Sequence, residues 1–260
     1  MKPLKRQHKS KQSKKIQDNN RKNERGNVLL YIFIAIALLA ALSYAVSSGN
    51  RGGTAEISSE RARLAASEIL EYTNNISNAV SQLKLRGCTD VEINFDNPTS
   101  ATDYSNPNAP VDNSCNIFHI TGGGLQYVDP QSIWLDSTSS AEDFYGEYLF
   151  TGSSCVDFLG TGSAGCDGDG SDAAELTIIV PFLQLEICQQ LNGLSGFEDV
   201  TAAPPAEADD AWTATPAFKG SYPAPEQISQ GDNQKAGCFA GKSGSTPNGG
   251  YHFYKVLMAR

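Results

Sequence analysis

The sequence lacks the patterns that metal-dependent and nucleophilic enzymes use. It contains no Cys-x-x-Cys pair, no His-Glu-x-x-His zinc signature and no Gly-x-Ser-x-Gly elbow around a serine. Histidine is scarce: besides His8 there are only His119 and His252, and both lie in apolar, strand-like runs, where packed histidines are more common than ligands. The sequence therefore predicts a protein that is not an enzyme.

Acidic residues are rare at the N-terminus, although the whole chain of 260 residues has a net charge of −9. Residues 1–26 hold ten basic and only two acidic side chains, whereas residues 27–260 hold ten basic and 27 acidic ones. A basic arm of this kind can bind nucleic acid. Because an apolar run follows directly, we interpret residues 1–26 as a cytoplasmic leader and expect no nucleic-acid partner.

The apolar run from Val28 to Val46 contains 19 residues and no charge. As a helix it would be about 28 Å long, close to the thickness of a bilayer's hydrocarbon core. We therefore predict a transmembrane helix over residues 27–48, in a single-pass protein of the bacterial inner membrane. A secretory signal peptide cleaved after Ala45, and a plain uncleaved anchor, are the alternatives.

Cysteine is absent from the leader and the apolar run. All six cysteines follow them, which suits a periplasmic or extracellular domain in a compartment that permits disulfides. These are Cys88, Cys115, Cys155, Cys166, Cys188 and Cys238. An even number favours up to three bridges, although fifteen pairings are possible.

The segment 49–87 is predicted to form an amphipathic helix. The Ser-Gly stretch at 47–53 should loosen the preceding helix, and Thr54 can cap a new start. Apolar residues then recur at steps of three and four. They are Ala65, Ile69, Tyr72, Ile76, Val80 and Leu83. Gly87 marks the end of this helix.

Residues 88–260 read as a β-rich domain with long loops. The predicted strands are Val91–Phe95, Asn116–Ile120, Leu125–Val128, Glu147–Thr151, Glu175–Val180 and Tyr251–Met258. Pro181 is suited to open a short helix that ends at Gly193, and Ala202–Pro225 reads as a surface loop. The aromatic residues of the domain are mostly expected in the core, with a minority exposed for recognition.

The junction Arg25-Gly26-Asn27-Val28 resembles the cleavage region of type IV prepilins and type II secretion pseudopilins, which have a basic leader ending in glycine before a hydrophobic helix. The resemblance implies that Gly26 ends the leader and Asn27 begins the mature chain. Tyr31 stands where the family has glutamate, so the resemblance implies a minor subunit. A set of uncharacterised bacterial pilin-like proteins is also similar, on Asp96-Asn97-Pro98, Cys188-Gln189-Gln190 and Tyr254-Lys255-Val256-Leu257.

This resemblance implies an α+β fold in which a long N-terminal helix, transmembrane and then amphipathic, packs on an antiparallel β-sheet. The expected function is that of a structural subunit of a filament or secretion apparatus, with other pilin or pseudopilin subunits, a prepilin peptidase and the inner membrane as partners. The alternatives are a membrane-anchored binding protein that never polymerises and a secreted domain released after Ala45.

The resemblance also bears on the disulfides. Pilins commonly join a segment after the central sheet to one near the C-terminus, and Cys188 and Cys238 are similarly placed. Cys155 and Cys166 enclose a glycine-rich loop and could pair with each other. That arrangement would leave Cys88 with Cys115.

One acidic loop is a candidate calcium site. Asp167, Asp169, Ser171 and Asp172 offer oxygen ligands of the kind that calcium prefers. The EF-hand pattern fails, because Asp172 and Ile178 stand where it needs glycine and glutamate. Some pseudopilins bind calcium in their C-terminal loops, and the alternative is an ordinary solvated turn.

Overall fold

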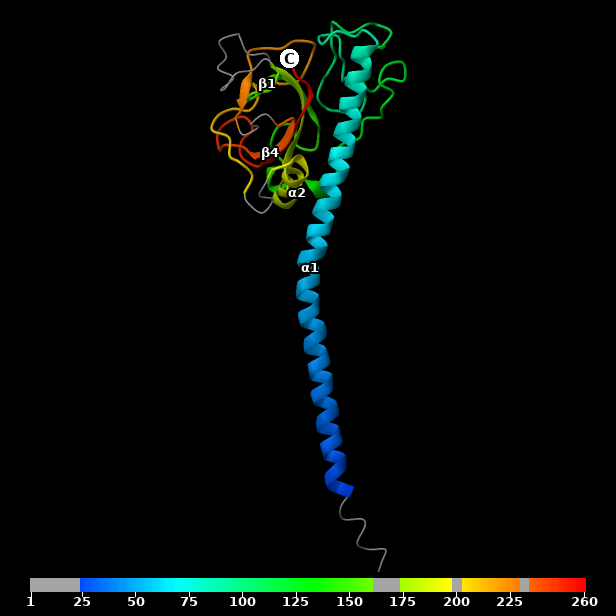
Figure 1. Cartoon of the computed structure of the whole chain (residues 1–260), viewed down its shortest axis with the longest axis vertical. Coiled ribbons are helices and arrows are strands. Elements are labelled where there is room, and N and C mark those ends of the chain that lie inside the picture. The colour runs from blue at the N-terminus through cyan, green and yellow to red at the C-terminus, as the bar shows by residue number, and fades with distance from the viewer. Residues whose placement is uncertain (1–23, 161–173, 198–202, 230–233) are drawn as a thin grey trace, which may run out of the picture. The chain divides into compact units, whose positions relative to one another are not determined.

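The computed structural model describes residues 24–160, 174–197, 203–229 and 234–260, and within these it leaves out the side chains of residues 24–29 and 42–58. Contacts divide the chain into two units, Met1–Ile57 and Ser58–Arg260. Helix α1 (Glu24–Leu85) contributes residues to both units (Figure 1). The helix runs through the Ser-Gly stretch, so the interruption predicted at residues 47–53 is absent.

Among the residues that the structure describes, no helix has a stretch apolar enough, over the length needed, to cross a membrane. This finding contradicts the transmembrane helix predicted at residues 27–48. The predicted single-pass location in the inner membrane is contradicted with it.

The second unit contains one five-stranded sheet with the order β3-β1-β2-β5-β4. Its strands are β1 (Leu149–Val156), β2 (Glu175–Leu183), β3 (Glu226–Ile228), β4 (Ala236–Ala240) and β5 (Tyr251–Met258). Strand β3 runs parallel to β1, whereas all the other pairs are antiparallel. The predicted antiparallel sheet is therefore wrong, because the sheet is mixed.

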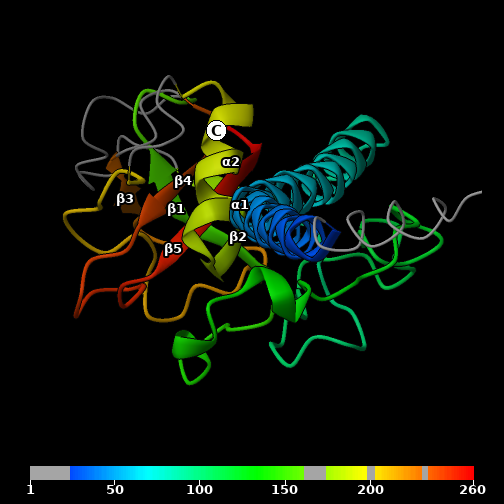
Figure 2. The same ribbon diagram turned by 90° about the horizontal axis from the view of Figure 1, so that it is seen from below.

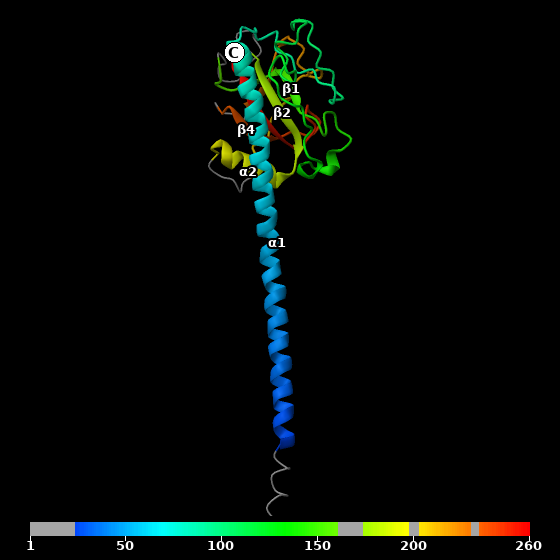
Figure 3. The ribbon, with the colours of Figure 1, turned by 90° about the vertical axis from the view of Figure 1, so that its right-hand side faces the viewer.

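Within the second unit, α1 packs against one face of the sheet with the apolar stripe that the sequence predicted (Figure 2 and Figure 3). Ile69, Ile76 and Leu83 are fully buried, and Tyr72 is half-buried. Helix α2 (Leu185–Ser195) adds to the same core and contacts β4 and β5. Its predicted start at Pro181 is wrong, because β2 continues through this proline to Leu183.

The opposite face of the sheet is covered by loops rather than by a helix. A second core there joins Ile179 and Tyr254 of the sheet to Ala211 and Trp212 of a long loop. Strand β2 is buried along its whole length because it has a core on each face. This explains why its sequence is apolar without alternation.

Residues 88–148 form an irregular layer that is joined by the disulfide Cys88–Cys115. Its only regular elements are the 3₁₀ turns η1 (Ser132–Trp134) and η2 (Ser137–Ser139). The three strands predicted between Val91 and Val128 are absent; an isolated bridge between Asn94 and Asn116 is present instead.

Candidate functional site

Two features of the described residues invite a functional interpretation, and the first is the apolar segment of α1. All twelve residues from Leu30 to Ala41 are exposed in the single chain. Eight of them have large apolar side chains that are 47–67% exposed: Leu30, Tyr31, Ile32, Phe33, Ile34, Ile36, Leu38 and Leu39. Successive helical residues are about 100° apart, so these side chains surround the helix on every side. A helix that is apolar all round normally has neighbours on every side.

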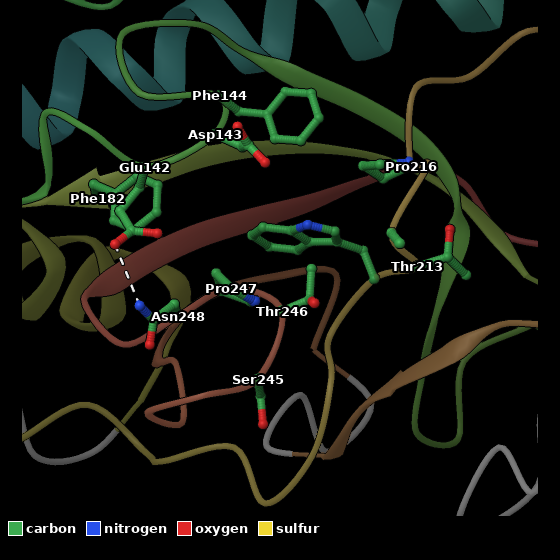
Figure 4. A pocket seen from close by; sticks show the side chains of 12 residues that line it. Glu142, Asp143, Phe144, Phe182, Thr213, Pro216, Ser245, Thr246, Pro247 and Asn248 are labelled. Carbon is green, nitrogen blue, oxygen red and sulfur yellow. Dashed lines mark hydrogen bonds between the residues drawn. The ribbon is translucent and has the colours of Figure 1, made fainter.

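The second feature is a cavity of about 210 Å³ in the second unit, which we call the acidic pocket. Three loops and β2 line it: residues 142–144, residues 212–214 with Pro216, residues 245–248, and Phe182. Figure 4 shows Asp143 and Phe144 on one side of the space and Thr246 and Pro247 on the other. The pocket therefore brings together distant segments: residues 142–144 and 245–248 are about a hundred residues apart in the sequence.

Beside the Trp212 indole, the polar side chains of the pocket are two carboxylates, three hydroxyls and one amide. Asn248 holds two loops together, because its amide nitrogen donates to Glu142 at 3.2 Å while its oxygen accepts from the Gly244 N–H at 2.9 Å. The Thr213 hydroxyl is buried in the wall and has no hydrogen-bond partner among the described residues. Among the residues that the structure describes, no lysine, arginine or histidine lines the pocket, so the formal charge of this lining is set by Glu142 and Asp143.

A buried histidine stands behind the aromatic wall. The ring of His252 lies 4.8 Å from that of Phe182 and 5.7 Å from that of Trp212, measured between centroids. Its Nδ1 accepts from the Phe182 N–H at 3.3 Å, and its Nε2–H donates to the Gly249 carbonyl at 2.6 Å. Burial lowers the pKa of His252 to about 4, so the ring is neutral at pH 7 and adds no positive charge to the pocket.

Two wall residues have a backbone conformation that suits glycine better than phenylalanine. The φ angle is 63° at Phe144 and 57° at Phe182. A left-handed conformation costs a residue with a side chain about 1–2 kcal/mol. Such conformations persist only where the surroundings impose them, and they are frequent at ligand sites.

The structure also places the residues that the sequence singled out. It contains the disulfides Cys88–Cys115 and Cys188–Cys238, two of the three pairs considered above. Cys166 of the third pair lies outside the described residues, as do Asp167, Asp169, Ser171 and Asp172 of the calcium hypothesis. Gly26 and Asn27 lie in α1, and their role in processing stays a prediction. Within the described ranges, no group of three or more His, Cys, Asp or Glu side chains could hold a metal ion.

Comparisons of the chain with protein-family models, with curated proteins and with solved structures found no match. The acidic pocket was not predicted from the sequence. The sequence did not distinguish Trp212 from the other aromatic residues of the domain, and it did not single out the pair Glu142-Asp143. An acidic pair within a run of small and aromatic residues was the available signal, but it did not indicate which distant loops would face it.

Proposed function

We propose that this chain is a structural subunit that assembles with other copies or with related subunits, in the manner of a minor pilin or pseudopilin, through the apolar segment at residues 30–41. The observation that carries the proposal is the exposure of eight large apolar side chains on consecutive turns of α1. Contiguous apolar patches on a soluble surface usually mark interaction sites.

The free energy of burial is sufficient for assembly. Burying one large apolar side chain contributes about 1.5–3 kcal/mol. Eight of them together offset the loss of translational and rotational freedom on association, which costs about 4–15 kcal/mol. Because the side chains surround the helix, one partner helix could cover only part of them. The pattern therefore favours a bundle with several neighbours, as in a filament, over a simple dimer.

Cross-linking from the apolar segment tests the assembly. A photoreactive phenylalanine analogue at Phe33 should give cross-links between chains, whereas the same analogue at the exposed, polar position Glu60 should not. In the chain that carries the analogue at Phe33, Ile36→Ser with Leu39→Ser should abolish the cross-linked species and shift the native mass towards that of one chain. Equal cross-linking from Glu60, or a single-chain mass for the unaltered protein, would contradict the proposal.

Processing is tested separately by the mass of the mature chain after co-expression with a prepilin peptidase. A chain that starts at Asn27, and that stays uncleaved when Gly26 is changed to Val, supports pilin-type maturation. A start at Met1 would favour the binding protein that never polymerises. A start at Val46 would favour a released domain, because the apolar segment would then be lost.

A further inference from the structure

No ion pair within the described part of the chain compensates the charge of the acidic pocket. Of the two carboxylates, Glu142 accepts one hydrogen bond, from Asn248, and Asp143 is exposed. The ion pairs found among the described residues involve other acids: Asp103 with Lys219, Asp209 with Lys242, and Asp90 with Arg260. The pocket therefore holds two acidic groups that are free to meet a positively charged ligand.

Beyond the two carboxylates, the walls combine the polar residues Thr213, Ser245, Thr246 and Asn248 with apolar and aromatic side chains. Phe144, Phe182, Trp212, Pro216 and Pro247 supply them. Aromatic faces attract cations through their negative π-density, and carboxylates attract them by charge. A ligand that satisfies both kinds of wall has a positively charged head and a short apolar body.

The size of the cavity limits the ligand. A volume of about 210 Å³ equals that of roughly seven liquid water molecules at about 30 Å³ each, which fits a molecule of five to eight heavy atoms. Trp212 is only 2% exposed, so it forms a wall and offers no broad face on which a sugar ring could stack. Two carboxylates also fall short of the six to eight oxygen ligands that calcium takes.

We propose that the acidic pocket binds a primary ammonium group carried on a short alkyl chain. The ammonium lies at Glu142 and Asp143, and the alkyl chain lies between Phe144 and Pro247. The same chemistry is found in a free alkylamine and in the side chain of a lysine on a polypeptide. The binding does not depend on assembly through residues 30–41.

Saturation-transfer NMR on the full-length chain tests this inference, because the signal is read from the small molecule and survives if the chain polymerises. The probe is n-butylammonium, with n-butanol and butyrate as neutral and anionic analogues of equal length. We expect transfer to butylammonium, at least tenfold weaker binding of the other two, and weakening by salt because the carboxylates are partly exposed. Equal binding of butanol would overturn the ammonium assignment.

A charge-matched pair of variants locates the site. Glu142→Gln with Asp143→Asn should weaken butylammonium binding at least tenfold. Asp129→Asn with Glu186→Gln removes the same charge from exposed positions outside the pocket and should leave binding unchanged. If both pairs weaken binding equally, the attraction is due to net charge alone and the pocket is not the site.

A second probe separates the two sources of the ammonium group. Nα-acetyl-lysine N-methylamide presents the lysine side chain within a peptide-like backbone. Binding of both probes at the pocket supports a polypeptide lysine as an occupant, and binding of butylammonium alone supports a free amine. Failure of both probes would overturn the inference, whatever the result of the assembly test.

Discussion

Replacing Asn192 by leucine should destabilise the second unit strongly, although the two side chains have the same number of heavy atoms and the same branching. Asn192 is 4% exposed and lies on α2 beside β4, the edge strand of the sheet. Its amide nitrogen donates to the Cys238 carbonyl at 3.0 Å, and its oxygen accepts from the Cys238 N–H at 2.6 Å. The side chain thus acts as the missing neighbour strand for this residue of β4.

The expected loss of stability follows from the two backbone groups of Cys238 that leucine would leave without a hydrogen-bond partner. Each buried backbone group without a partner costs about 1–3 kcal/mol. Asn192→Leu should therefore lower the free energy of unfolding by about 2–6 kcal/mol, and accommodating the bulkier leucine adds a cost of about 1–3 kcal/mol. The disulfide Cys188–Cys238 lies one helical turn away and must stay oxidised, so that the chain cross-link is the same in both proteins.

Denaturant unfolding measures the total effect, and amide hydrogen exchange measures its location. The Cys238 amide should exchange faster in the variant, while that of Ala240, which donates to the Pro205 carbonyl at 2.7 Å, should be less affected. Gln190→Leu, on a half-buried position of the same helix, is the control and should change stability by less than about 0.5 kcal/mol. A loss below about 1 kcal/mol for Asn192→Leu would refute the reasoning.

Three further predictions concern the fold around the pocket and the irregular layer. The pKa of His252 is about 4 in the folded chain and 6.5 when unfolded. The free energy of unfolding should therefore fall by up to about 3 kcal/mol as pH drops from 6.5 to 4, because the unfolded chain binds the proton more tightly. His252→Leu should lack this part of the pH dependence in urea titrations. Gly220→Ala should lower the free energy of unfolding by about 2–4 kcal/mol in denaturant titrations, because φ is +76° and the new Cβ would collide with Asn106. Gly146→Ala is the control: φ is +84°, but the new Cβ meets open space, so the loss should be about 1 kcal/mol. Phe144→Gly should be more stable than Phe144→Ala by about 1 kcal/mol in thermal melts, the reverse of the usual order, because φ is positive there.

The parts of the fold that the sequence predicted are those with a strong local pattern. The stripe from Ala65 to Leu83 recurs with the helical period, so the buried face of α1 could be identified without any knowledge of the sheet. Strands β2 and β5 are apolar runs that lie in the interior of the sheet, and both were predicted. The parallel strand β3 has only three residues, and nothing local could indicate its pairing with β1.

Asparagine explains why the strands predicted before Val128 are absent. The side chain of Asn106 donates to the carbonyls of Val91 and Ile93, and that of Asn116 donates to the carbonyl of Asp96. These groups would be satisfied by a neighbouring strand in a sheet, but here side chains take that role, as short polar residues do when they compete with regular structure. The apolar residues of these runs indicated burial correctly at Ile93, Phe95 and Ile117 but not at Ile120 and Val128, which are exposed, and they were a wrong indication of strand pairing.

The acidic pocket could not be predicted from the sequence, because hydrogen bonds between distant segments place the loops that line it. Its walls come from loops whose sequences carry no common pattern, and long-range hydrogen bonds join these loops: Asn248 donates to Glu142, and the Ala211 N–H donates to the Thr246 carbonyl. Periodicity reports which residues are buried, but the position of a loop depends on such long-range bonds. A site of this kind becomes predictable only once the bonds that fix its loops are known. His252, outside the pocket lining, adds two more such bonds, to Phe182 and to the Gly249 carbonyl.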